Sequence, residues 1–170
     1  MSELSIPAEQ FILHWGEMSS RWGINRSMAQ IHALLYLAEE PLNAEQIAER
    51  LVLARSNVSS SLRELMAWGV IRVVHRLGDR RDFFEAEADA WSLLQAILRQ
   101  RKQREIDPTR EMLRGCIKEH EKERGGDVTS IQRMRELLEL LETLVSWYEQ
   151  MSRLSPSMQR KILRLGQKLA

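Results

Sequence analysis

Hydrophobic residues recur at helical spacing in the N-terminal part of the chain. One stripe predicts an amphipathic helix that begins near Pro7 and ends at Trp22-Gly23. The members of this stripe are Phe11, Trp15, Met18 and Trp22. A second helix is predicted over about residues 27–39, with Asn25 as its N-cap and Pro41 beyond its end. Its inward positions are Met28, Ile31, Leu35 and Ala38.

Two further helices are predicted on either side of a tight connection, residues 52–54. The first is capped by Asn43, and Gln46 three positions later completes a capping-box pattern. Its buried side consists of Ile47, Ala48 and Leu51. The second covers about residues 55–68 and stops at Gly69, where a left-handed residue is favoured. Its inward positions are Val58, Leu62, Leu65 and Met66.

A β-hairpin is predicted directly after these helices. Residues 70–76 are rich in β-branched side chains, residues 77–82 form a polar turn that contains glycine, and residues 83–86 resume extended structure. Everything after about Ala88 is predicted to be helical, and the next helix starts with Trp91, Leu94, Ile97 and Leu98.

The C-terminal part carries clear helix boundaries. Asp107-Pro108 predicts a cap and a first-turn proline, so a helix starts or restarts there. The apolar side of that helix consists of Met112, Leu113, Cys116 and Ile117. Gly125-Gly126 breaks the chain, and Ser155-Pro156 opens a last helix. The apolar positions of this last helix are Met158, Ile162, Leu165 and Leu169.

A long helix is predicted from Asp127 to about Met151, and it has two apolar stripes. The first comprises Ile131, Met134, Leu138, Leu141, Val145 and Tyr148. The second comprises Leu137, Leu140, Leu144, Trp147 and Met151. Two adjacent stripes have to be covered on two sides. We expect one to face its own domain and the other to face a second subunit.

Composition places the chain in an ordinary globular class. It has 170 residues, of which 44% are hydrophobic and 29% charged, about the size of one domain. The single cysteine, Cys116, excludes an intrachain disulfide and favours a reducing compartment. No apolar run approaches the roughly 20 residues of a membrane helix, and MSELSIPAEQ lacks the features of a signal peptide. We therefore expect a cytoplasmic protein without a membrane partner.

The net charge of +1 conceals a basic segment. Residues 1–49 have a net charge of −5, and residues 83–170 have a net charge of +2. Residues 50–82 carry seven arginines, no lysine and three acidic residues, a net charge of +4. The planar fork of arginine suits phosphates and the guanine edge. This segment therefore has two interpretations, a nucleic-acid partner or a solvated face.

Two helices joined by a tight turn and followed by a hairpin form a winged helix-turn-helix. The predicted fold class is mainly α with a small β-hairpin wing and long dimerisation helices. Residues 25–87 would bind DNA, residues 1–24 would contribute to the dimer or a pocket, and residues 88–170 would form a helical dimerisation and effector region. The second helix of such a pair has an apolar back and small polar or basic groups that fit the major groove.

The candidate DNA-binding residues lie mostly on this helix and on the hairpin. They are Asn43, Arg55, Ser56, Asn57, Ser59, Ser60, Arg63, Arg76, Arg80 and Arg81. The arginines of the hairpin tip suit a phosphate backbone or a minor groove, and Asp79 or Asp82 could hold one of them by an ion pair.

A winged helix that binds proteins without DNA is the alternative. The chain has no Gly-rich phosphate loop, HExxH or GxSxG motif, so we expect neither an enzyme nor a cofactor.

Residues 43–85, with the Asp79-x-Arg81 wing tip, resemble the winged-helix core of the MarR-type transcriptional regulators. A longer resemblance, to the GbsR-like branch, runs from about Phe11 through the C-terminal helices. It rests on FILHWGEMSSRWGINRSMAQIHALLYL, LVLARSNVSSSLRELMAWGVIRVV and GDRRDFFEA. The resemblance implies a homodimeric, sequence-specific DNA-binding regulator, often a repressor, that dimerises through helices outside the winged core. Ala54 departs from the pattern, because many such motifs have a Ser or Thr cap there.

The aromatic residues have two interpretations. They form core or dimer packing, or they line an effector pocket that involves Trp15, Trp22, Trp91, Trp147 and Tyr148. Some GbsR-like regulators respond to choline or glycine betaine, and aromatic faces attract quaternary ammonium groups.

Cys116 and His120, with Glu119 and Glu123 nearby, form either a metal or redox sensor or a small buried thiol beside a surface histidine. We expect the second of these and no metal site.

Overall fold

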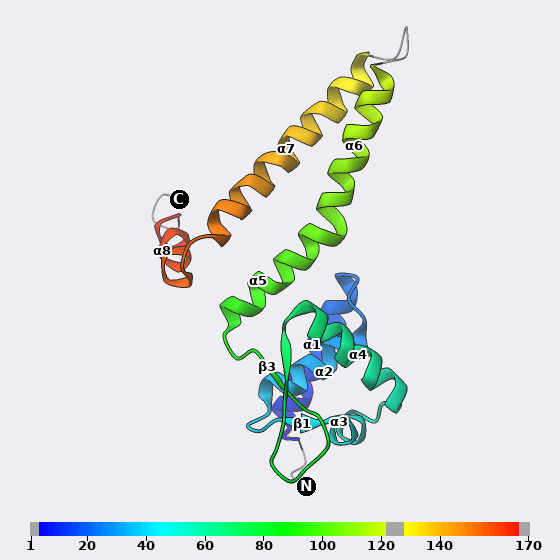
Figure 1. The fold of residues 1–170 in the computed structure, drawn as a ribbon, viewed down its shortest axis with the longest axis vertical. Coiled ribbons are helices and arrows are strands. Elements are labelled where there is room, and N and C mark those ends of the chain that lie inside the picture. The colour runs from blue at the N-terminus through cyan, green and yellow to red at the C-terminus, as the bar shows by residue number, and fades with distance from the viewer. Residues whose placement is uncertain (1–3, 122–127, 167–170) are drawn as a thin grey trace. The chain divides into compact units, whose positions relative to one another are not determined.

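The computed structural model describes residues 4–121 and 128–166. The chain divides into two compact units, residues 1–96 and residues 97–170 (Figure 1). Five residues that the sequence analysis singled out lie outside the described residues, namely Glu123, Gly125, Gly126, Asp127 and Leu169. The structure is mainly helical with a small sheet, and this confirms the predicted fold class.

Four helices of the first unit occupy the predicted positions. They are α1 (Ile6–Arg21), α2 (Arg26–Leu37), α3 (Ala44–Leu51) and α4 (Arg55–Trp68). Asn25 caps α2 by accepting a 3.1 Å hydrogen bond from the Met28 amide. Gly69 ends α4 with a φ of 70°. Capping side chains and a left-handed glycine therefore set these boundaries.

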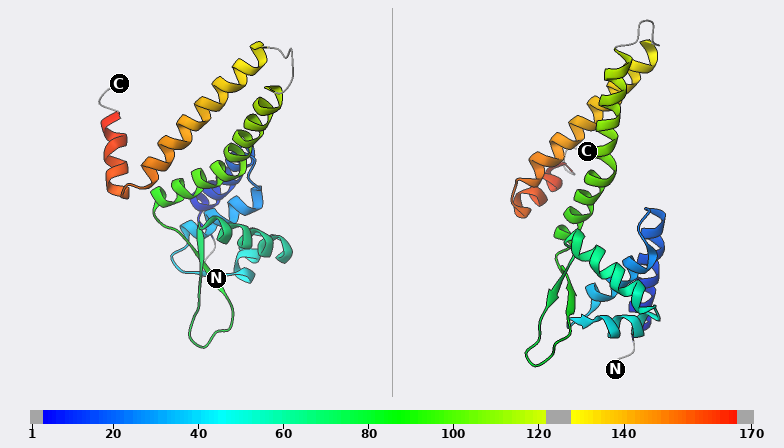
Figure 2. Two further views of the ribbon diagram at one scale, coloured as in Figure 1. Left: turned by 45° about the horizontal axis from the view of Figure 1, so that its top comes forward. Right: turned by 45° about the vertical axis from the view of Figure 1, so that its right-hand side comes forward.

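The sheet has three antiparallel strands, one more than the sequence predicts. They are β1 (Leu42–Asn43), β2 (Ile71–Val74) and β3 (Phe83–Ala86), in the spatial order β1-β3-β2. β2 and β3 form the predicted hairpin, whose loop extends beyond the helices in both views of Figure 2. A two-residue strand is too short for a recognisable alternation, so β1 was not predicted. It ties the start of α3 to the wing, because Asn43 lies opposite Phe83.

The core of this unit lies where α2, α3 and α4 meet the sheet. Ile31, Ile47 and Val58 are completely buried, and Leu62 is 2% exposed. All four were predicted to face inward. The helix-turn-helix pair is therefore stiffened from behind by its own apolar residues.

The buried side of α1 differs from the predicted aromatic stripe. The buried residues are Ile12, Gly16 and Ser19, whereas Phe11, Trp15 and Met18 are half-buried. Trp22 follows the last helical residue and is 55% exposed. A Cβ at Gly16 would lie only 2.7 Å from Cγ of Gln30 in α2. The small side chains on α1 therefore allow the close approach of α2, which centres the contact on Gly16.

The prediction that Asp107 caps a new helix is wrong. α5 (Ala90–Arg101) continues through a π-helical turn, Lys102–Ile106, directly into α6 (Asp107–His120). Asp107 has helical dihedral angles, and its carboxylate accepts a 2.9 Å hydrogen bond from Nζ of Lys102. Proline removes one amide donor from a helix, and the wider turn lies just before Pro108. The Asp107-Pro108 pair therefore marks a change of helical geometry within the continuous helical segment from α5 to α6.

The second unit is built on α6 and α7 (Val128–Ser152), which run antiparallel side by side, followed by α8 (Pro156–Gly166) (Figures 1 and 2). Two ion pairs join α7 to α6 and its end, Arg114–Glu142 at 2.6 Å and Arg135–Glu121 at 2.8 Å. Within the described ranges, no helix has the length and apolar character needed to cross a bilayer.

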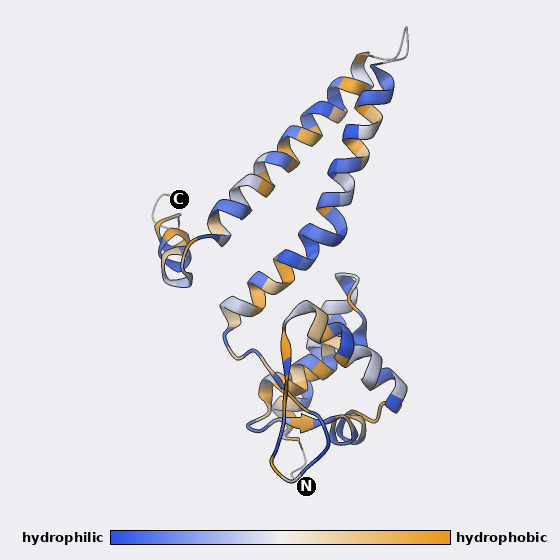
Figure 3. Ribbon diagram, in the orientation of Figure 1, coloured by the Kyte–Doolittle hydropathy of each residue, from blue (hydrophilic) through white to orange (hydrophobic). Residues whose placement is uncertain are grey.

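The two predicted stripes of α7 differ in exposure. In the first stripe Ile131 and Val145 are buried, and the others are half-buried. Most of the second stripe is open, with exposures of 45% for Leu137, 55% for Leu140, 53% for Leu144 and 58% for Trp147. Figure 3 shows hydrophobic positions recurring along the whole of α7. On α6, Leu113 is buried, whereas Met112 and Cys116 are exposed although both were predicted to lie on the apolar side.

Candidate nucleic-acid interface

The outward face of α4 has the predicted composition. Six of the candidate residues on it are exposed, namely Arg55, Ser56, Asn57, Ser59, Ser60 and Arg63. Val58 and Leu62, on the opposite side, lie in the core. The helix therefore presents one polar, basic face to solvent while its apolar face fixes its position, which is what entry into a major groove requires.

The N-terminus of α4 has no side-chain cap. Ala54 occupies the N-cap position and offers no hydrogen-bonding side chain. The first intrahelical bonds run from the amides of Asn57 and Val58 to the carbonyl of Ala54, at 3.0 and 3.1 Å. An N-terminus of this kind attracts anions, because its first amides and the helix dipole favour negative charge. It can therefore accept a phosphate.

Local hydrogen bonds order the polar face of α4. Asn57 donates from Nδ2 to Oγ of Ser27 in α2 at 3.4 Å, and the Ser60 hydroxyl donates to the Asn57 carbonyl at 3.0 Å. Arg63 donates from Nε to the Ser59 carbonyl at 3.4 Å. These contacts leave the terminal guanidinium nitrogens of Arg63 available to an external acceptor.

The wing tip is a tight loop with one arginine fixed and one arginine open. Gly78 has a φ of 82°, which residues other than glycine rarely adopt. Asp79 accepts three hydrogen bonds from the Arg81 side chain, of which the one from Nη2 is 2.6 Å, and a 3.0 Å bond from the Arg81 amide. These bonds to Arg81 lower the pKa of the Asp79 carboxyl to about 2. Within the described part of the chain, no ion pair reaches Arg80.

Arg76 is held by the body of the unit. Its Nη2 donates to Oε2 of Glu40 at 3.1 Å and to the Pro41 carbonyl at 3.3 Å. Its guanidinium lies 4.4 Å from the centroid of the Phe83 ring, and the Arg81 guanidinium lies 5.7 Å from the same ring. Arg76 therefore joins the wing to the segment before β1 by an ion pair and a cation–π contact. Its geometry favours a structural role over the predicted DNA contact.

Asn43 also has a structural role. It is only 3% exposed, and its Oδ1 accepts hydrogen bonds of 3.0 Å from the amides of Glu45 and Gln46. Gln46 returns the bond to the Asn43 amide at 2.9 Å, which completes the predicted capping box. Because this side chain is buried and its Oδ1 accepts both bonds of the cap, we do not retain Asn43 as a DNA contact.

A hollow between α3, α4 and the wing brings several candidates together. It is lined by Asn43, Ala44, Glu45, Ser59, Leu62, Arg63, Met66, Arg81, Asp82 and Phe84. Ser59 and Arg63 of α4 therefore share one surface with Arg81 of the wing. The hollow has two acidic members. Asp82 was considered as an ion-pair partner of a wing arginine, whereas Glu45, in the first turn of α3, was not singled out.

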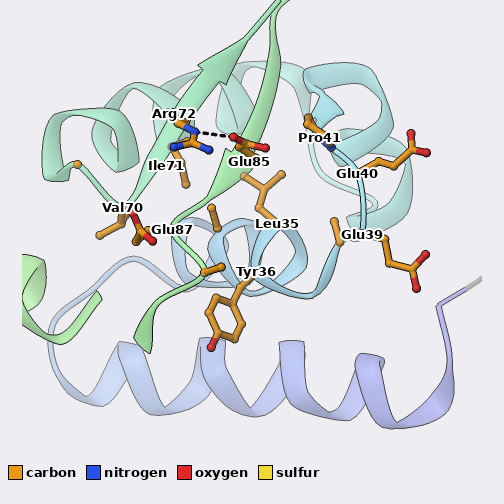
Figure 4. A pocket seen from close by; sticks show the side chains of 14 residues that line it. Leu35, Tyr36, Glu39, Glu40, Pro41, Val70, Ile71, Arg72, Glu85 and Glu87 are labelled. Carbon is orange, nitrogen blue, oxygen red and sulfur yellow. Dashed lines mark hydrogen bonds and ion pairs between the residues drawn. The ribbon is translucent and has the colours of Figure 1, made fainter. Parts of the chain in front are cut away.

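A second hollow lies at the end of α2 beside β2 and β3, and it contains none of the candidate residues (Figure 4). Its charged lining includes the ion pair between Arg72 Nε and Glu85 Oε1 at 2.5 Å. Glu39 and Glu40 extend away from that pair, and Tyr36 points toward α1 in Figure 4. The carboxylates of this hollow do not converge on one point.

The five effector candidates lie on or next to three helices. Trp15 belongs to α1 and Trp22 follows its last residue, Trp91 belongs to α5, and Trp147 and Tyr148 belong to α7. Trp15 stacks between Phe11 and His32, with ring centroids 5.6 and 6.4 Å away. None of the five lines either hollow. The effector pocket stays a prediction.

The described residues contain no group of three or more His, Cys, Asp or Glu side chains that could hold a metal ion. Cys116 is exposed, with Sγ 3.7 Å from Sδ of Met112 in the preceding turn. It is therefore not the buried thiol that we expected.

Comparison with known proteins agrees with this geometry. Residues 22–82, which include the helix-turn-helix pair and the wing tip, match the model of the MarR family. No curated protein matches the chain. The fold and the family match agree that residues 22–82 form a winged helix-turn-helix domain similar to that of the MarR family.

Solved structures with a similar fold include a protein described as a transcriptional regulator. It has 18% sequence identity and a TM-score of 0.62, over 87% of this chain and 99% of its own. Another is MepR, a transcription regulator of the Staphylococcus aureus multidrug efflux pump MepA, with 13% identity and a TM-score of 0.40 over 96% and 90% of the two chains. An S. aureus MepR–DNA complex has 15% identity and a TM-score of 0.37 over the same shares. The first of these likenesses supports the fold.

Proposed function

We propose that this protein is a sequence-specific repressor of the GbsR-like branch that binds double-stranded DNA as a homodimer. The observation that carries the proposal is the outward face of α4. It presents two arginines, one asparagine and three serines to solvent over a buried apolar back. This combination of cations and small hydrogen-bonding groups suits both phosphates and base edges.

The roles of the residues follow from their positions. Asn57, Ser59 and Arg63 would face base edges once α4 lies in the major groove. Arg55 and the uncapped amides at the start of α4 would bind a phosphate. Arg80 and Arg81 would lie along the backbone or in the adjacent minor groove. In this assignment the Asp79 carboxylate orients Arg81 toward DNA.

The dimer part of the proposal rests on α7. Leu137, Leu140, Leu144 and Trp147 form a stripe of four large apolar side chains, each about half exposed. Burying apolar surface stabilises an interface by roughly 25 cal/mol per Å². A second copy of the chain would cover this stripe symmetrically, as most homo-oligomers do.

Release by a small effector is the remaining part of the proposal. An effector would have to bind more tightly to the conformation whose α4 spacing does not fit DNA. The aromatic residues Trp15, Trp22, Trp91, Trp147 and Tyr148 are the candidates for that contact. Their faces would suit a quaternary ammonium compound such as choline or glycine betaine.

Binding of mixed-sequence duplex DNA over a series of salt concentrations tests the proposal. We expect Arg63→Ala to weaken binding, and Arg81→Ala to reduce the salt slope by about 0.9. Arg21→Ala is the matched control, because it removes the same charge from an exposed position on α1. Equal affinity and slope for all three variants would contradict the contact assignment.

A protein-binding winged helix is the second candidate function. It is favoured by one observation: Arg55, Arg76 and Arg81 already pair with carboxylates of the same chain. Such pairing reduces the positive charge that a DNA surface needs. Absence of DNA binding at low salt would support this alternative.

A further inference from the structure

Glu45 lies between two of the arginines that the proposed function assigns to DNA. Its Oε1 is 3.1 Å from Nη2 of Arg55 at the start of α4, and its Oε2 is 4.0 Å from Nη1 of Arg81 in the wing. The side chain of Glu45 is 57% exposed, that of Arg55 is 81% exposed and that of Arg81 is 56% exposed. The carboxylate therefore sits on the proposed DNA-binding face and joins its two parts.

The local fold accounts for this position. The Asn43 cap places Glu45 in the first turn of α3, where the helix dipole favours a negative charge. Asn43 also pairs with Phe83 at the start of β3, so the first turn of α3 lies beside the wing. The tight turn after α3 then brings Arg55 within reach of the same carboxylate.

The arginines of this face differ in how far their charge is already neutralised. Arg81 is bound by Asp79 and approached by Glu45, and the ion-pair partner of Arg55 is Glu45. No carboxylate in the described residues pairs with Arg63. A phosphate that approaches Arg55 must therefore displace or share the Glu45 carboxylate.

We propose that Glu45 is an intramolecular competitor for the DNA phosphates. It pairs with Arg55 and Arg81 in the free protein, and it lowers the affinity of the winged helix for any duplex by making the phosphates replace it. This inference rests on the proposed function, because it needs Arg55 and Arg81 to contact DNA. Glu45 acts only through these two arginines.

The test compares Glu45→Gln with Glu49→Gln in the full chain. Both changes remove one negative charge from α3 and leave an amide of the same size. Glu49 is exposed, and within the described residues no cation pairs with it. The measurement is the affinity for mixed-sequence duplex DNA over a salt series, since the salt slope reports how many phosphates the protein neutralises.

We expect Glu45→Gln to bind about two- to fivefold more tightly at low salt than Glu49→Gln, a difference of ~0.4–1 kcal/mol that an exposed ion pair allows. We also expect its salt slope to be steeper by about 0.9, because Arg55 then neutralises a phosphate without first releasing a carboxylate. A purely structural role for Glu45 would not steepen this slope.

The other outcomes are distinct. Equal affinity and slope for the two variants would overturn the inference and leave the proposed function standing. Weaker binding by Glu45→Gln would also overturn it and would show that Glu45 orients the arginines for DNA. Failure of the unaltered protein to bind DNA at low salt would instead contradict the proposed function.

Discussion

At the scale of single residues, the aromatic side chains of α1 and α2 form a stacked row. Phe11, Trp15, His32 and Tyr36 follow one another with ring centroids 5.6, 6.4 and 6.1 Å apart. His32 is 4% exposed, and its Nε2 has no hydrogen-bond partner among the described residues. Burial lowers the pKa of His32 from 6.5 to about 4. The folded protein therefore holds this imidazole neutral.

This burial predicts a loss of stability on acidification. Below pH 6.5 the unfolded chain binds a proton at His32 that the folded chain binds only near pH 4. The stabilisation that results from keeping His32 neutral in the folded state is complete above pH 6.5. It falls as the pH approaches 4, and the free energy of unfolding is lower by ~2–3 kcal/mol at pH ~4.5. Urea denaturation of the unaltered protein and of His32→Phe, above pH 6.5 and at pH ~4.5, measures this loss of stability.

The variant His32→Phe keeps a stacked ring and should lose most of this pH dependence. His14→Gln is the control, because His14 is exposed on α1 and should keep it. The same decrease in stability for His32→Phe as for the unaltered protein would show that other groups cause it.

At the scale of elements, local signals predicted the helix-turn-helix well. The Asn43 capping box and the glycine after Trp68 are readable over a few residues, so α3, α4 and the hairpin were confirmed. Non-local contacts account for the differences. The pairing of β1 with β3 and the approach of α2 to Gly16 depend on segments far apart in the sequence. No local pattern encodes such contacts.

The candidate DNA-binding residues likewise divide into those that local patterns predicted and those whose roles depend on non-local contacts. The helical period separated the exposed face of α4 from its buried face without any structural information. The structural role of Arg76 was not predictable, because it depends on Glu40 and Phe83. The capping role of Asn43 was predicted, but its burial was not. Glu45 was missed because its nearness to Arg81 depends on β1.

The uncapped start of α4 predicts a separable effect on stability. Ala54→Ser would supply an acceptor for the first amides of α4 and should raise the free energy of unfolding by about 0.5–1 kcal/mol. Urea denaturation measures this change, and Ala67→Ser, inside the same helix and exposed, is the control that should not stabilise. A lower stability for Ala54→Ser would show that the start of α4 has no room for a cap.

At the scale of the whole molecule, charge and apolar surface are segregated along the chain. The basic segment 50–82 covers α4 and the wing as far as its tip, and three of its arginines, Arg55, Arg76 and Arg81, pair with acids from residues 1–49. The exposed apolar stripe belongs to α7 in the second unit. The proposed DNA-binding and dimerisation surfaces therefore lie in different units.

The stripe predicts which substitutions separate the subunits. Leu140→Glu with Leu144→Glu should convert a dimer to a folded monomer, because both side chains are more than half exposed and a charge there costs the interface its apolar burial. Light scattering gives the mass, and circular dichroism checks the helices.

Two controls sharpen this test. Ser146→Glu lies about 200° round the helix from Leu144 and should stay dimeric. Val145→Glu places a charge in the buried face of α7 and should unfold the second unit instead. A folded dimer of the double variant would show that the interface lies elsewhere.

The most direct test of the central claim is selection from a pool of random duplex DNA, followed by sequencing of the retained molecules. The account predicts enrichment of a near-palindrome whose half-sites lie about one helical turn, or roughly 10 base pairs, apart. The enriched half-site should change or disappear when Asn57 and Arg63 are both replaced by alanine. Retention without any enriched sequence, or no retention at low salt, would contradict the claim that α4 of this protein reads DNA sequence.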